Sequence, residues 1–234
     1  MGDFAEAFHT AGRLIVEGDP ALIAIVLLSI RVSLTAVLLA AAIGLPLGAA
    51  LALARFPGRG GLVILTNACM GFPPVIAGLV LYILLSRAGP LGSWGLLFTP
   101  GAMIVAQCGL VTPIIAALTR QLVEDLWAEY REQLKSLGAS RLSAAFTLLW
   151  DARLSLATAV LAGFGRASAE VGAIMIVGGN ISGVTRTMTT AIALETSKGD
   201  LSLALGLGFV LLTLTLIVNG ATQLASEALR RRAG

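Results

Sequence analysis

Residues 21–54 read ALIAIVLLSIRVSLTAVLLAAAIGLPLGAALALA, an apolar run of 34 residues with one charged side chain, Arg31. At 1.5 Å per residue, a helix of this length extends about 50 Å, which exceeds the roughly 30 Å of a hydrocarbon core. We therefore expect a membrane-spanning helix that tilts or protrudes, with Arg31 near one interface. Hydrophobic residues make up 57% of the 234 and charged residues 12%, which excludes an ordinary soluble domain.

Further apolar stretches follow along the chain, so the predicted fold class is an all-α membrane protein with about five transmembrane helices. Their expected limits are about 61–86, 101–119, 153–178 and 201–221. The second is interrupted by GFPP, and because each proline removes a backbone donor, the helix must break or kink there. Broken helices in membranes usually line cavities, so Pro73 and Pro74 are candidate residues of a translocation path or gate.

The long polar stretch 120–153 contains no proline and one glycine, so it is expected to form helical segments jointed at Gly138. A second polar connection, 178–200, contains an apolar patch short enough for a re-entrant or interfacial helix. Residues 1–20 are mildly amphipathic and lack a signal-peptide pattern, which indicates an external segment lying on the surface. Residues 21–222 then form a single transmembrane domain, and 223–234 form a cytoplasmic tail.

Basic residues predict the orientation, because loops rich in lysine and arginine stay in the cytoplasm. One set of alternate loops holds ten, namely Arg55, Arg59, Arg120, Arg131, Lys135, Arg141, Arg153, Arg230, Arg231 and Arg232. The other set holds four, namely Arg13, Arg87, Arg186 and Lys198. The amino terminus is therefore expected outside, and the 120–153 loop and the carboxyl terminus inside.

Catalytic signatures are absent from the sequence. It contains no GxxxxGK[ST] phosphate loop, and its single histidine, His9, rules out an HExxH metal site and a Ser/His/Asp triad. A transport subunit is therefore the first hypothesis. A membrane enzyme that uses Glu170 for proton chemistry is the second, and a purely structural helix bundle is the third.

Residues 163–173, GFGRASAEVGA, place Arg166 and Glu170 inside an apolar run. Side chains four residues apart share a helix face and can pair, and a paired charge is far cheaper in hydrocarbon than a lone one. Either the pair is structural and holds helices together, or it borders a hydrated anion path in which Glu170 holds Arg166 or a closed gate. Asn180, after two glycines, is either a turn residue or a donor near that gate.

The sequence Glu132, Gln133, Leu134, followed by Gly138, resembles the EAAxxxG loop of ABC importer permeases. The resemblance implies a short coupling helix docked in a groove of a cytoplasmic ATPase, and on the residues alone a solvated amphipathic helix with a glycine turn is the alternative. The family's Leu-Pro is replaced here by Trp150-Asp151. The coupling residues that the resemblance implies are Glu132, Gln133, Leu134, Leu137, Gly138 and Ala139, with Leu142 and Phe146 as further apolar contacts.

Two other segments extend the resemblance. Residues 71–85, GFPPVIAGLVLYILL, and 164–173, FGRASAEVGA, resemble the Pro-Pro-Val-x-x-Gly span and the Arg then Glu-x-Gly-Ala pattern of molybdate and sulfate permeases. Residues 174–208, IMIVGGNISGVTRTMTTAIALETSKGDLSLALGLG, look like the permease subunit of tungstate ABC importers. Together these matches cover roughly residues 21–222.

The resemblance implies a type I ABC importer permease (MetI-like) fold in a bacterial or archaeal cytoplasmic membrane. It implies a homodimer that works with two cytoplasmic ABC ATPases and with a periplasmic or lipid-anchored binding protein. The cargo is an oxyanion, tungstate first, with molybdate or sulfate as alternatives. This chain binds no cofactor, since ATP and Mg are used by the ATPase, and its other partner is membrane lipid rather than nucleic acid. Thr185, Arg186 and Thr187 either meet the binding protein or the oxyanion, or only cap a short helix.

Overall fold

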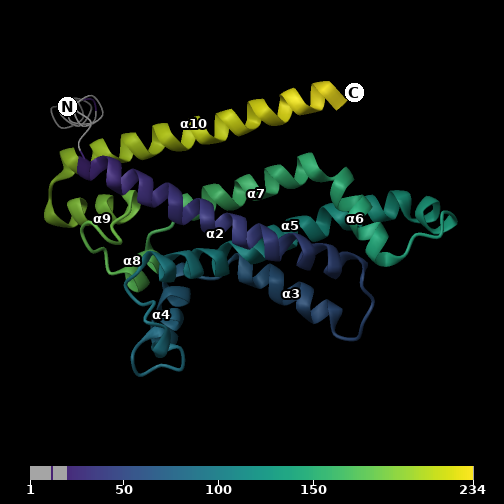
Figure 1. Ribbon diagram of the computed structural model, residues 1–234, viewed down its shortest axis with the longest axis horizontal. Helices are drawn as coiled ribbons and strands as arrows, with labels where there is room; N and C mark the ends of the chain where they lie inside the picture. The colour runs from purple at the N-terminus through teal and green to yellow at the C-terminus, as the bar shows by residue number, and fades with distance from the viewer. Residues whose placement is uncertain (1–11, 13–19, 234) are drawn as a thin grey trace. The chain divides into compact units, whose positions relative to one another are not determined.

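The computed structural model describes residue 12 and residues 20–233, and within that part of the chain every regular element is a helix (Figure 1). The all-α prediction is therefore confirmed, whereas the predicted external segment 1–20 lies almost wholly outside the described residues. The elements are α2 Pro20–Leu53, α3 Arg59–Met70, α4 Pro74–Leu85, the 3₁₀ turn η1 Gly92–Trp94, α5 Pro100–Ser136, α6 Arg141–Asp151, α7 Arg153–Ser168, α8 Gly172–Gly178, α9 Met188–Lys198 and α10 Leu201–Ala233.

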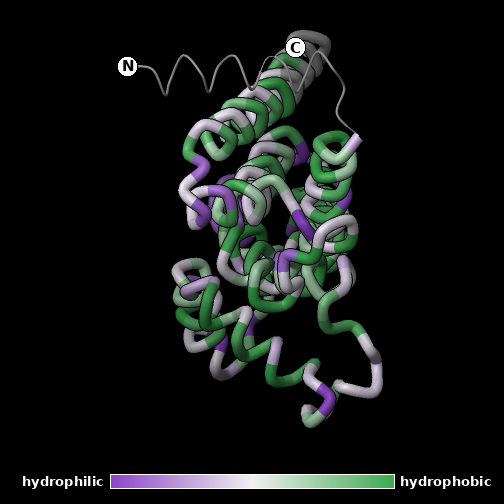
Figure 2. Tube along the Cα trace, turned by 90° about the vertical axis from the view of Figure 1, so that its left-hand side faces the viewer, coloured by the Kyte–Doolittle hydropathy of each residue, from purple (hydrophilic) through white to green (hydrophobic). Residues whose placement is uncertain are grey.

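Three described helices are long and apolar enough to cross a membrane by themselves, namely α2, α5 and α10. Two bent pairs, α3 with α4 and α6 with α7, raise the number to as many as five if each pair is one span. Hydrophobic residues run along most of the helices in Figure 2, and many of them face outward. Leu27, Ile64 and Leu216 are each at least 60% exposed, as lipid-facing side chains would be.

The chain divides into two compact units, each built from separate stretches. The first contains the described residues up to Ala36, together with Pro73–Gln107 and Gly165–Ala221. The second contains Val37–Phe72, Cys108–Phe164 and the end of α10 from Thr222. Helices α2, α5, α7 and α10 contribute residues to both units.

The predicted end of the third span is wrong, because its helix continues. The third span was expected to end near 119, but α5 runs to Ser136 and takes up the first half of the polar stretch. Nothing between 120 and 136 breaks a helix, and Val123 is fully buried in a cluster with Ala49 and Leu148. The fifth span was expected at about 201–221, which agrees with the apolar stretch Leu201–Val218 that is able to cross a membrane, and the helix α10 itself continues to Ala233.

The fourth predicted span, 153–178, is not one helix. Helix α7 ends at Ser168, and α8 begins at Gly172. The break coincides with Glu170, whose side chain accepts a hydrogen bond from the Ala173 amide at 3.1 Å. A carboxylate that bonds a backbone N–H three residues later competes with continued helix, which is why the chain restarts there.

In the first unit, α9 lies against the beginning of α2 (Figure 1). Leu22 of α2 is buried with Met188 and Ala191 of α9 and with Leu207 of α10. The Met188 amide donates to the Ser29 hydroxyl at 2.9 Å, so a polar side chain of α2 satisfies the first turn of α9. The prediction of a short helix within 178–200 is thereby confirmed.

Helices α4 and α8 pack closely in the same unit because small residues meet between them (Figure 1). A Cβ added to Gly78 of α4 would lie 2.7 Å from Ala173 Cα of α8, and one added to Gly172 would lie 2.8 Å from Val75 Cγ2. The Pro-Pro-Val-x-x-Gly and Glu-x-Gly-Ala segments, about a hundred residues apart, therefore form one interface.

Replacing Gly78 with valine should destabilise the protein by about 1–3 kcal/mol, since the new side chain meets the α8 backbone rather than a movable side chain. Thermal unfolding of the purified chain in detergent measures the effect. Gly109→Ala in α5 is the matched control, because a Cβ there meets nothing within 4 Å and alanine is the better helix former. Equal melting temperatures for the Gly78 variant and wild type would contradict the close packing.

Candidate functional site

Glu170 is the centre of a buried polar cluster in the first unit. Its side chain is 3% exposed, and one carboxylate oxygen accepts from Arg166 Nη1 at 2.7 Å. The other oxygen accepts from the Ala173 amide, while the Glu170 backbone carbonyl accepts from the Thr189 hydroxyl at 2.8 Å. The predicted pairing of Arg166 with Glu170 is confirmed. Their shared helix face is not, because Glu170 lies in the break between α7 and α8.

Gln107 of α5 joins this region and was not anticipated from the sequence. Its side chain is 1% exposed, and its amide nitrogen donates to the Ala167 carbonyl at 2.9 Å and lies 3.5 Å from the Ser33 hydroxyl. Its carbonyl oxygen is buried without a hydrogen-bond partner among the described residues. A lone glutamine inside an otherwise apolar span was the available signal, because lipid offers it no partner.

Pro73 and Pro74 start α4 rather than kink a continuous helix. Pro73 occupies the N-cap position with φ −62° and ψ 121°, and its carbonyl accepts from Ile76 and Ala77. Pro74 takes the first helical position, where a missing N–H costs nothing. The break predicted at GFPP is therefore confirmed, and it positions the helix that packs against α8.

Asn180 is a turn residue in this structure. Its φ of 49° places it in the left-handed region, which asparagine tolerates better than most residues. Its side-chain nitrogen donates to the Thr190 carbonyl at 3.3 Å, and its side-chain oxygen is buried without a described partner. The turn interpretation accounts for the backbone, and the free acceptor leaves Asn180 able to bind a further donor.

Thr185 and Thr187 are buried, and their hydroxyls are used inside the protein. The Thr185 hydroxyl donates to the Gly178 carbonyl at 2.6 Å and accepts from the Ile181 amide at 2.9 Å. Thr187 forms a capping box with Thr190 at the start of α9. The structural alternative thus explains both threonines, whereas Arg186 between them is partly exposed.

The predicted coupling segment in the second unit is jointed at Gly138 as expected. Gly138 has φ +72°, and its amide donates to the Lys135 carbonyl just beyond the end of α5. Helix α6 then starts behind Ser140, whose hydroxyl accepts from the Ser143 amide. Residues 132–136 of the predicted coupling segment form the end of α5, and the short separate helix after the joint is α6, Arg141–Asp151.

Helix α6 has two apolar faces. Ala144 and Leu148 are buried against the unit, whereas Leu142, Phe146 and Trp150 are about 70% exposed, at 70%, 67% and 72%. The exposed three recur every four residues and form one stripe, and Leu137, in the turn that precedes α6, is 81% exposed. We call these four residues the α6 stripe.

The other predicted coupling residues divide by exposure. Glu132 and Gln133 are exposed, Ala139 is half-buried, and Leu134 packs on the cluster formed by Leu148 and its neighbours. Leu134 therefore belongs to the unit's own core more than to a partner's groove.

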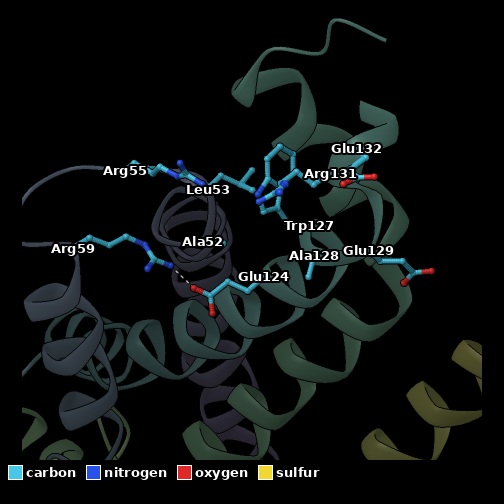
Figure 3. A pocket seen from close by; sticks show the side chains of 11 residues that line it. Ala52, Leu53, Arg55, Arg59, Glu124, Trp127, Ala128, Glu129, Arg131 and Glu132 are labelled. Atoms are coloured by element: carbon cyan, nitrogen blue, oxygen red, sulfur yellow. Dashed lines mark hydrogen bonds and ion pairs between the residues drawn. The ribbon is translucent and has the colours of Figure 1, made fainter. Parts of the chain in front are cut away.

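Glu132 also lines a polar cavity of about 610 Å³ (Figure 3). Glu124 of α5 bridges two arginines beside it, Arg59 at the start of α3 and Arg120 of α5. Arg59 Nε also donates to the Leu51 carbonyl at 2.6 Å, so this network joins the end of α2 to α3 and α5. Figure 3 shows Arg59 directed at Glu124.

Side-chain contacts between Arg153 and Trp150 hold the chain where it leaves α6. Helices α6 and α7 are bent by 75° at Ala152. The Arg153 guanidinium donates to the Trp150 carbonyl at 2.8 Å and lies 5.1 Å from the Trp150 ring centroid. This contact closes the bend at the position where the family pattern has Leu-Pro.

Comparison with known proteins identifies the family. The sequence matches the binding-protein-dependent transport system inner membrane component family over residues 44–231. The chain belongs to this family. It is therefore a multi-pass membrane subunit of a transport system, and the prediction of a non-catalytic transport subunit is confirmed. Such a system implies an ATPase and a substrate-binding protein as partners.

Several curated permeases are similar to this one over most of their length. The tungstate uptake system permease protein TupB of Peptoclostridium acidaminophilum is 42% identical, with 97% of this chain and 100% of that protein aligned. A probable anion ABC transporter permease of Haloferax volcanii is 40% identical over 85% of this chain and 88% of its own. The molybdenum transport permease ModB of Escherichia coli K12 is 28% identical, over 89% and 95%.

Replacing Glu170 with glutamine should destabilise the permease by about 1–3 kcal/mol, because Arg166 loses its charged partner next to a buried site. Joint replacement of Arg166 and Glu170 by glutamine should cost less than the sum of the single changes. Thermal unfolding of the four proteins of this cycle measures the coupling.

Lys198→Gln is the control for this cycle, because it breaks an ion pair whose lysine is 54% exposed and should matter little. Strict additivity of the Arg166 and Glu170 changes would contradict a mutually dependent pair.

Proposed function

We propose that the chain is the membrane-spanning subunit of an ATP-driven importer that carries tungstate. The observation that supports this most is the 42% identity to a tungstate uptake permease over nearly the whole of both chains. Molybdate and sulfate are the alternative cargoes, because molybdenum and sulfate permeases are similar at 28%.

The working assembly that we propose is a homodimer of the permease with two cytoplasmic ATPases, which use ATP and Mg, and an external binding protein. A two-fold pair places identical faces around one axis, which gives a central path that a single copy has too few spans to enclose. In this assembly the amino terminus is outside and the carboxyl terminus is inside. The excess of basic residues in the loops on the carboxyl-terminal side supports that orientation.

Coupling to the ATPase is proposed to run through the α6 stripe together with Glu132, Gln133 and Gly138. An apolar stripe of about two helical turns with a neighbouring carboxylate suits docking of a helix into a groove. Leu142 and Phe146 of the stripe also line an apolar cavity of about 500 Å³ beside the end of α2. Movement of an ATPase against the stripe would therefore act on α2, α5 and α7, which all join or pack on α6.

The translocation path or gate is proposed to include Arg166, Glu170, Pro73, Pro74 and Asn180. Pairing with Glu170 lets Arg166 present a partial rather than a full positive charge, and its side chain is 35% exposed. A divalent anion must bind strongly enough to enter and weakly enough to leave, so a neutralised arginine suits a path better than a free one.

Gly138→Val should lower ATP-driven uptake strongly, because a β-branched residue at φ +72° strains the joint between α5 and α6. Gly138→Asn should retain most uptake, since asparagine tolerates left-handed backbone. Uptake and ATP hydrolysis by proteoliposomes measure both variants. Normal coupled uptake by a folded valine variant would refute the assignment of the joint.

The cargo is tested in proteoliposomes that contain the permease with its own ATPase and binding protein. We expect ATP-dependent tungstate accumulation that excess sulfate leaves unchanged and that molybdate reduces only at higher concentration. Accumulation of sulfate or molybdate in preference to tungstate would replace tungstate by that anion. A lack of ATP-dependent uptake of all three would overturn the proposed function.

A further inference from the structure

A cavity of about 430 Å³ lies in the first unit, between the beginning of α2 and the turn that precedes α9. Two arginines line it, Arg31 from α2 and Arg186 from the turn, and none of its described lining residues is acidic. Arg31 is exposed, and no acidic partner is found for either arginine among the described residues. Two guanidinium groups at one cavity without a carboxylate create a positive potential there, which attracts anions.

Arg186 carries the strongest sign of a missing partner. Its Nε is shielded from solvent and has no hydrogen-bond partner in the described part of the chain. A buried charged donor that is left unsatisfied costs more than a neutral one, so such atoms usually mark a site whose acceptor lies outside the described residues.

The turn holds Arg186 rigidly in place. Its amide donates to the Ile181 carbonyl at 3.1 Å, and its neighbours Thr185 and Thr187 are both buried with their hydroxyls bonded inside the unit. The backbone that carries the guanidinium is therefore fixed, and only side-chain freedom is lost when a ligand binds.

The depth of Arg31 adds a second argument. It lies eleven residues after Pro20, about 16 Å along α2, so in a membrane-crossing α2 it sits at or below the headgroup level. The remaining walls include Ile25, Leu28 and Val184, which lower the local dielectric and strengthen attraction for an anion. A guanidinium at this depth is costly unless an anion compensates it.

We propose that Arg31 and Arg186 form a binding site for a compact oxyanion with several acceptor oxygens. The planar guanidinium fork matches oxygen pairs on tungstate, molybdate or a phosphate group. The source is either the free oxyanion cargo or the phosphate of an anionic phospholipid. The first source rests on the proposed function, and the second does not.

The test uses the full-length permease without its ATPase, in phosphatidylcholine nanodiscs. Tungstate retention is measured by elemental mass spectrometry. In a parallel preparation with phosphatidylglycerol, the retained lipid is measured by native mass spectrometry. The variants are Arg31→Gln and Arg186→Gln, with Arg186→Lys as the variant that keeps the charge. Arg87→Gln is the matched control, because Arg87 is exposed, lies in the same unit and does not line the cavity.

If the free oxyanion is the ligand, both glutamine variants should bind tungstate at least about tenfold more weakly, while the Arg87 variant binds as wild type does. If the lipid phosphate is the ligand, tungstate should not be retained, and phosphatidylglycerol should be lost from the same two variants alone. Arg186→Lys should retain part of the binding in either case, which separates loss of charge from loss of folding.

The proposal is overturned if wild type retains neither ligand, or if the Arg31, Arg186 and Arg87 variants retain it equally. Uptake measured in proteoliposomes distinguishes failure of this binding site from failure of the proposed cargo. If tungstate uptake is normal and binding does not depend on the two arginines, only this binding site is refuted. If phosphatidylglycerol binding depends on the two arginines but no oxyanion is taken up, only the proposed function is refuted.

Discussion

The carboxylate of Glu170 is buried at the point where the chain leaves α7 and enters α8, and one ion pair and two hydrogen bonds at this residue set the geometry around it. Arg166 neutralises its charge, the Ala173 amide binds its second oxygen, and Thr189 binds its backbone carbonyl. Because an unpaired carboxylate is costly in a membrane interior, Arg166 and the Ala173 amide stabilise its charged form, while Thr189 fixes the backbone beside it. Helix α8 is thereby fixed where Ala173 meets Gly78 and Gly172 meets Val75 of α4.

In the second unit, the chain reverses direction after the long helix α5 while its side chains stay packed in the core of that unit. Gly138 takes the left-handed conformation that ends α5, and Ser140 caps the helix that follows. Arg153 then holds the bend behind Trp150. Leu134 and Leu148 bury the inner side of this turn, so it is anchored to α2 and α5 rather than suspended from them.

Much of this architecture could be predicted because it depends on local chemistry. Long apolar runs indicate helices, the two prolines at 73 and 74 predict a break between helices, and a glycine in a polar stretch predicts a joint. The break at Glu170 could not be predicted, since periodicity favours a continuous helix and the break depends on Thr189 from a distant element. Helical segments were expected in 120–153, but the continuity of the first segment with the third span was missed because the change to polar residues near 120 was taken as the end of that helix.

Site residues were predicted less well than helices. The Arg166–Glu170 pair could be predicted from the four-residue spacing and from the high cost of an unpaired charge in hydrocarbon. Burial of Thr185 and Thr187 depends on how the 181–187 turn folds, which no local pattern specifies. Gln107 was visible as a polar residue in a span, yet its partners on α2 and α7 are known only from the fold. Residues 31 and 186 are far apart in the sequence, so no local pattern predicts that Arg31 and Arg186 line the same cavity.

The α6 stripe has a consequence for biogenesis. A newly made copy exposes the four apolar side chains of the stripe, Leu137, Leu142, Phe146 and Trp150, until another polypeptide covers them. Exposed apolar patches favour nonspecific association. In the coupling that we propose, copies made without their ATPase keep this stripe uncovered and are prone to aggregation or quality-control proteolysis, which favours synthesis of the subunit in step with its companions.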